Sequence, residues 1–162
     1  MREIIDELQK NFETLIERSA TMTKEVTAND LFRKPEAFEG TFEMYSFGEF
    51  ILRSAAAIEQ AFAGMTTRLW DDPFEWTLPE YMASPERMLL YFDEVSETTR
   101  RGFAFMKTDE DLKRRIPAPR ELRTIFHVLL YAYERAAHFQ GRAAAVHRLI
   151  SSGRTTSDPE RA

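Results

Sequence analysis

The stretch that decides the fold is LRTIFHVLLYAYERAAHFQGRAAAVHRLI, residues 122–150. It is long enough for about eight turns of α-helix, and it contains all three histidines of the chain. Four of its residues are spaced by four, three and four positions, so they form one stripe on such a helix: His127, Tyr131, Glu134 and His138. Apolar residues on several other sides predict a helix that is packed by neighbours. We therefore expect functional chemistry to lie along the stripe.

The composition excludes several classes of function. The chain has 162 residues, of which 43% are hydrophobic, and this is enough for the core of one globular domain. It has no cysteine, so any metal would have to be held by histidine and carboxylate. A net charge of -5 argues against general binding of nucleic acid. No apolar run approaches the length of a membrane span and the amino terminus is charged, so we expect a cytoplasmic protein without a membrane partner.

Three further stretches with helical periodicity come before this one. The first covers about residues 2–26 and has an apolar stripe at steps of three and four. The second covers about residues 46–63, where Ser46 and Glu49 have the spacing of a capping box, and the glycine that follows is expected to end it. The third covers about residues 84–107 and begins with a serine N-cap followed by proline.

These four helices predict an all-α fold, a four-helix bundle. The connection of about 20 residues between the second and third helices is long enough for a crossover, so these two helices can run parallel. Pro117 and Pro119 are expected to set the start of the fourth helix. We expect residues 1–150 to form one domain and residues 151–162 to form a flexible tail.

The chain resembles the DinB-like (DinB/YfiT) superfamily over about residues 1–150. The resemblance is carried by SFGEFILRS at residues 46–54, the loop around Trp70, and YERAAHFQGR at residues 133–142. It implies a bundle with a crossover and a divalent metal, often zinc or nickel, held by three histidines at one end of the bundle. The implied activities include thiol transfer, isomerisation and a proposed hydrolysis.

The chain departs from the superfamily pattern at the metal ligands. Arg53 occupies the position of the histidine in the second helix, Glu134 replaces the first histidine of H-x-x-x-H, and His138 is retained. A guanidinium group cannot coordinate a cation and repels one nearby. We therefore predict that the metal site is lost, that no metal cofactor is bound, and that Arg53 and Glu134 form an ion pair inside the bundle.

Two alternatives stay open. In the first, the chain is a metal-dependent hydrolase or thiol S-transferase that uses zinc or nickel. Its ligands would be His138 and Glu134, with Glu49, one turn before Arg53, as a further carboxylate. In the second, the chain is a structural or interaction protein, and the stripe on its last helix serves only for packing.

The preferred hypothesis is a DinB-like bundle that retains a small-molecule pocket or has a non-catalytic role, as a homodimer. Tyr131 is a candidate for lining that pocket with its hydroxyl group directed inward. His127 is interpreted as a hydrogen-bonded interior or interface residue, and His147 as a surface residue. Trp70, Trp76 and the aromatic residues near them are interpreted as anchors of their long connection.

Overall fold

The computed structural model describes residues 1–35, 44–75 and 81–155, and these residues form a helical bundle. Its long helices are α1 (Glu3–Glu25), α3 (Phe47–Thr67), α4 (Pro85–Ala104) and α5 (Ile125–Thr155). The shorter elements are α2 (Ala28–Leu31), the 3₁₀ turns η1 (Pro73–Glu75) and η2 (Asp109–Lys113), and the strands β1 (Arg115–Pro117) and β2 (Leu122–Thr124). The prediction of an all-α four-helix bundle is confirmed, with one small hairpin added. None of the helices in the described ranges is both long and apolar enough to cross a membrane.

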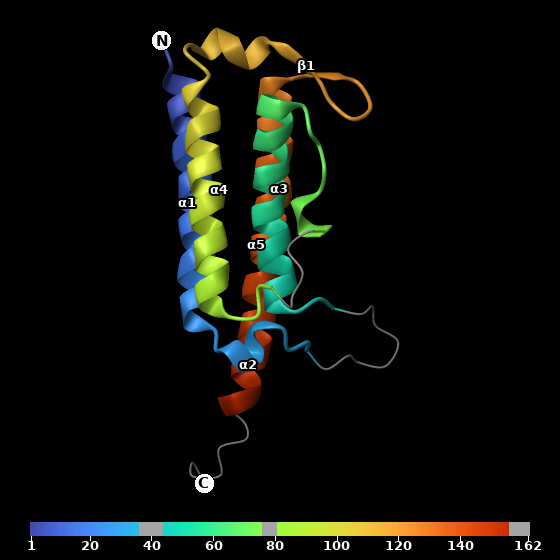
Figure 1. The fold of residues 1–162 in the computed structure, drawn as a ribbon. Coiled ribbons are helices and arrows are strands. Elements are labelled where there is room, and N and C mark those ends of the chain that lie inside the picture. Colours follow the sequence, from blue (N-terminus) through green and yellow to red (C-terminus); the bar gives the residue numbers. More distant parts are fainter. Residues whose placement is uncertain (36–43, 76–80, 156–162) are drawn as a thin grey trace.

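The long helices are arranged as two pairs (Figure 1). Helix α1 lies beside α4, and α3 lies beside α5, while α3 also packs against α4. Figure 1 shows α3 and α4 running in the same direction, opposite to α1 and α5. The chain between α3 and α4 therefore has to return along the length of the bundle, which is the crossover that the sequence predicts.

A cluster of phenylalanines holds the two pairs together. The ring of Phe12 in α1 lies 5.5 Å from that of Phe62 in α3 and 5.8 Å from that of Phe103 in α4, measured between centroids. The Phe62 and Phe103 rings are 5.1 Å apart, and all three side chains are fully buried. A Cβ atom at Gly102 would lie 2.3 Å from the ring of Phe62, so glycine is needed there for α4 to approach α3. Edge and tilted ring contacts of this kind add to the stabilisation from burial alone.

The predicted start of α3 is confirmed, but its predicted end is not. The side chain of Ser46 accepts a hydrogen bond from the backbone nitrogen of Glu49, and the Glu49 carboxylate accepts one from the backbone nitrogen of Ser46. The helix continues through Gly64 to Thr67 and ends at Arg68, whose φ of 64° is left-handed. A Cβ atom at Gly64 would lie 2.3 Å from the ring of Trp70, so this glycine makes room for the indole and does not end the helix.

The segment before α5 also differs from the prediction. Strands β1 and β2 pair in antiparallel fashion, with Pro117 opposite Leu122, so α5 begins three residues later than expected. Helix α5 also extends to Thr155, five residues past the predicted end of the domain. The rest of the predicted tail, together with Trp76, lies outside the described residues. The hairpin was missed because each strand has only three residues and carries no alternating pattern long enough to detect.

The phenylalanine cluster leads to a prediction about stability. Phe103→Ala should lower the free energy of unfolding by about 3–5 kcal/mol, because it leaves a cavity between three helices. Phe105, two positions further on, is 70% exposed, so Phe105→Ala is a matched control that should change stability far less. Urea unfolding followed by circular dichroism measures both variants. An equal loss in the two would contradict the described packing.

Candidate functional site

The stripe that the sequence singled out on α5 faces solvent. His127, Tyr131, Glu134 and His138 are all exposed, and Tyr131 has 53% of its surface accessible. The side of α5 that faces α3 carries small residues instead, with Ala132 and Ala136 buried. His127 is therefore not an interior residue of this chain, since it lies at the surface, and its position at an interface stays a prediction.

Arg53 and Glu134 do not meet, so the predicted ion pair is corrected. Within the described residues, the guanidinium of Arg53 lies over two aromatic rings, 3.9 Å from the centroid of Phe74 and 4.6 Å from that of Tyr45. The hydroxyl of Ser54 donates to the carbonyl oxygen of Ala136 at 2.8 Å, which turns position 136 of α5 toward α3. Glu134 precedes Ala136 by two positions, about 200° around the helix, so it points away from α3.

The two rings give the Arg53 guanidinium a different kind of partner. A guanidinium that stacks on aromatic faces gains cation–π attraction and gives up little hydration. Its Nε atom is buried and has no hydrogen-bond partner in the described part of the chain. The contacts with the two rings therefore stabilise the guanidinium in place of a hydrogen bond at Nε. Tyr45 precedes α3 and Phe74 belongs to η1, so Arg53 ties both flanking segments to α3.

The residues that the sequence analysis assigned to the metal position do not fit a metal ion. The guanidinium of Arg53 cannot act as a ligand. The carboxylate of Glu49 accepts hydrogen bonds from the backbone nitrogen of Ser46 at 2.7 Å and from its hydroxyl at 2.9 Å, so it is engaged in the helix cap. The described residues contain no group of three histidine, aspartate or glutamate side chains placed to hold one ion.

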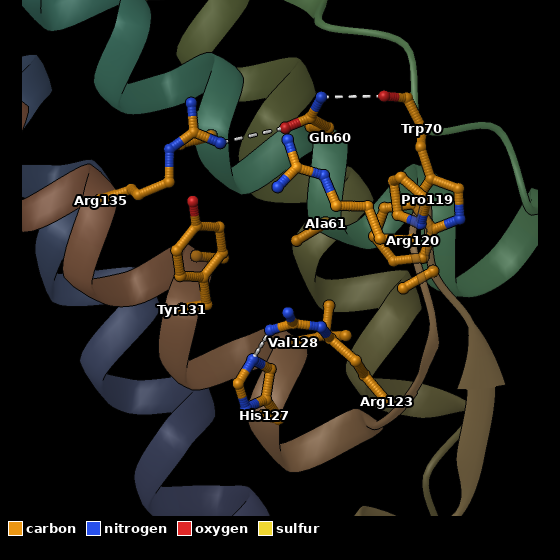
Figure 2. Close-up of a pocket in the computed structure, with 13 residues that line it drawn as sticks. Gln60, Ala61, Trp70, Pro119, Arg120, Arg123, His127, Val128, Tyr131 and Arg135 are labelled. Atoms are coloured by element: carbon orange, nitrogen blue, oxygen red, sulfur yellow. Dashed lines mark hydrogen bonds between the residues drawn. The ribbon is translucent and has the colours of Figure 1, made fainter.

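A pocket of about 360 Å³ lies between α3, α5 and the hairpin (Figure 2). Its floor is apolar and made of small, buried side chains from the two helices: Ala57, Ala61, Val128 and Ala132. Its walls are Gln60, Trp70, Pro119 and Tyr131. Four further lining residues have basic side chains: Arg120, Arg123, His127 and Arg135. Residues from α3, the crossover, the hairpin and α5 therefore meet at one place.

Hydrogen bonds fix the walls of the pocket. Nη1 of Arg135 donates to the side-chain oxygen of Gln60 at 3.2 Å, and the Gln60 amide nitrogen donates to the carbonyl of Trp70 at 2.8 Å. The indole nitrogen of Trp70 donates to the carbonyl of Pro117 at 3.2 Å. Trp70 is thus held by α3 and by the hairpin, which agrees with its interpretation as an anchor of the connection. At the other side of the pocket Arg123 donates to the ring of His127.

The pocket is basic in an acidic protein. Among the described residues that line it, three are arginines and none is acidic, although the chain carries 27 aspartates and glutamates. The nearby carboxylate of Glu121 lies 2.7 Å from Nη2 of Arg123 but does not line the pocket. Such a cluster of cations on low-dielectric walls concentrates positive potential, which attracts anions.

The sequence did not single out the arginines of this pocket. Arg135 follows His127 and Tyr131 in steps of four on α5, so a search for that spacing would have placed the three on one face. The superfamily pattern directed attention to its neighbour, Glu134. Arg120 could not be found by periodicity, because the hairpin turn that carries it has none.

A second hollow, of about 430 Å³, has the opposite charge. It is lined by Glu59 and Glu94 among others, and by Tyr91, which is 5% exposed. The hydroxyl of Tyr91 donates to the Glu59 carboxylate at 2.5 Å. Burial first, and then the negative charge of Glu59, raise the pKa of Tyr91 above its usual range.

His147, predicted at the surface, is half-buried with its ring 5.9 Å from that of Phe47.

Comparison with solved structures identifies the fold. A crystal structure of a DinB-like protein from Bacillus cereus ATCC 10987 superimposes on this chain with a TM-score of 0.69. The match covers 89% of this chain and 91% of the other, at 15% sequence identity. No protein-family profile and no curated protein sequence matches the chain. The chain therefore has a DinB-like fold.

The placement of Arg53 can be tested with two double-mutant cycles on the free energy of unfolding. Arg53→Met and Glu134→Gln should be additive within about 0.5 kcal/mol, because the two side chains do not touch. Arg53→Met and Phe74→Leu should show a coupling larger than about 0.5 kcal/mol, because they share a cation–π contact. Urea unfolding of the single and double variants gives both values. Coupling to Glu134 without coupling to Phe74 would restore the ion pair that the sequence predicted.

Proposed function

We propose that this DinB-like bundle binds a small anionic molecule in the pocket between α3 and α5, and that it works without a metal centre. The observation that carries the proposal is the set of three arginines and one histidine around an apolar floor. Carboxylates and phosphates are the groups that such a set recognises, because the guanidinium donors match their oxygens in pairs.

The size and shape of the pocket support a small molecule in preference to a macromolecule. A volume of about 360 Å³ is near the lower end of the range typical of small-molecule sites. Its mixture of apolar floor and few polar groups is also typical, since the floor supplies contact area and the polar groups fix orientation. A net charge of -5 disfavours a polyanion such as nucleic acid, which would meet repulsion outside the pocket.

The metal-dependent hydrolase or thiol S-transferase remains the alternative activity. It would use Glu134 and His138, which lie one turn apart on the exposed face of α5, and it needs a further ligand. The position that supplies this ligand in the superfamily pattern is Arg53. The structural or interaction protein also remains an alternative, and it requires the pocket to bind nothing. That the protein is a homodimer stays a prediction. Size-exclusion chromatography with light scattering checks it by measuring the molecular mass in solution.

Anion binding should raise the melting temperature. At constant ionic strength, members of a panel of phosphate, benzoate, citrate and aliphatic carboxylates should stabilise the protein in a concentration-dependent way relative to chloride. Arg135→Gln should abolish most of this gain, because it removes a charge that lines the pocket. Arg148→Gln, an exposed site further along α5, is the matched control and should keep the gain. If every anion matches chloride, the structural alternative is favoured and the proposal fails.

Metal content separates the proposed function from the enzymatic alternative. Protein purified without a metal-affinity tag should contain far less than one zinc or nickel ion per chain by mass spectrometry of the metals. Added zinc should leave the melting temperature unchanged, and Glu134→Gln with His138→Gln should not alter either result. A stoichiometric metal that is lost in this double variant would establish the alternative.

A further inference from the structure

Two of the three arginines that line the pocket lie at separate places. Arg135 is held by the Gln60 amide at one end, and Arg123 contacts His127 at the other. His127 and Arg135 are eight positions apart on α5, which corresponds to about 12 Å along the helix axis. Figure 2 shows Tyr131 between them, with its hydroxyl directed toward Arg135. We call these the Arg135 end and the Arg123 end.

The side chains of the floor between the two ends cannot form a hydrogen bond with a charged group. Ala57, Ala61, Val128 and Ala132 are at most 6% exposed, and their side chains have neither donors nor acceptors. An anionic group placed over this floor would lose water without gaining a hydrogen bond, which is unfavourable. An apolar body would instead gain from burial there. The floor therefore accepts the middle of a ligand but not its charge.

We infer that the ligand of this pocket carries two anionic groups joined by a short apolar body, with one anionic group at each end of the pocket. The inference rests on the proposed function, because it specifies the ligand class of the same site. A single carboxylate or phosphate can engage one end only and leaves the other cations without an anion. A dianion neutralises both, and its apolar body covers the floor.

The hydrogen bonds already present leave donors for such a ligand. Arg135 uses Nη1 toward Gln60, and a guanidinium has five N–H donors in all. Arg123 is shared between His127 and the carboxylate of Glu121, which approaches from outside the pocket. Glu121 therefore competes with an incoming anion for Arg123. Its removal should strengthen binding at the Arg123 end, whereas the loss of either arginine should weaken binding.

Matched pairs of acids test the inference by isothermal titration calorimetry at fixed pH and ionic strength. Adipate is compared with hexanoate, and suberate with octanoate, so that each pair differs in one terminal carboxylate. At least one diacid should bind about tenfold more tightly than its monoacid, as expected for an additional charge-assisted hydrogen-bonded contact. Equal affinity within both pairs overturns the inference.

Variants at the two ends provide the second part of the test. Arg123→Gln and Arg135→Gln should each reduce the affinity for the diacid about tenfold, to near that of the monoacid. Glu121→Gln should raise the affinity for the diacid, and Arg148→Gln should leave it unchanged. Arg135→Lys keeps the charge and should retain part of the affinity, which guards against a loss caused by misfolding. Diacid binding that neither arginine variant weakens would overturn the inference.

The failure of this inference differs from the failure of the proposed function. If monoacids or phosphate bind and depend on Arg135, but diacids gain nothing, the pocket binds anions and only the two-ended ligand is wrong. If neither the acids nor any other anion of the panel binds, the proposed function falls together with the inference.

Discussion

The close approach of α3 and α5 is the constraint on which the rest of the structure depends. Ser54 donates to the Ala136 carbonyl, and the alanines around this contact let the two backbones come near each other. The same alanines form a pocket floor with little side-chain bulk. The same small side chains therefore allow the two helices to pack closely and leave space for the pocket. Larger residues at Ala57 or Ala132 would fill that room and push the helices apart.

Arg53 shows how a half-buried position can keep a charge without a carboxylate. The rings of Tyr45 and Phe74 face its guanidinium, so the cation is sheltered by aromatic surfaces. This arrangement links α3 to the segment before it and to the crossover after it. A histidine at this position would offer a lone pair to a metal, whereas an arginine offers only donors and a fixed charge. The arginine thus provides no metal ligand at this position, while it connects three segments of the chain.

The helices could be predicted from the sequence because their signals are local. Apolar periodicity and the caps at Ser46 and Ser84 place α1, α3 and α4, and the length of the crossover predicts the parallel pair. Gly64 was misread because its role is to accommodate Trp70, a tertiary contact that the local sequence does not encode. The sequence could not predict that Glu134 points away from α3, or that Arg120 of the hairpin lines a pocket together with residues of α5. Both depend on how separate elements are rotated and packed against one another. A family pattern aligns positions, but it does not orient side chains.

The crossover also has a consequence for how the chain folds. Both lateral helix pairs, α1 with α4 and α3 with α5, join elements that are distant in sequence, and the two helices linked by the crossover run parallel. Helices α3 and α4 are successive long helices that pack against each other, but because they run parallel they cannot close as a simple hairpin. Formation of the core therefore requires large loops to close before most apolar surface is buried, which slows folding relative to a bundle of consecutive antiparallel helices.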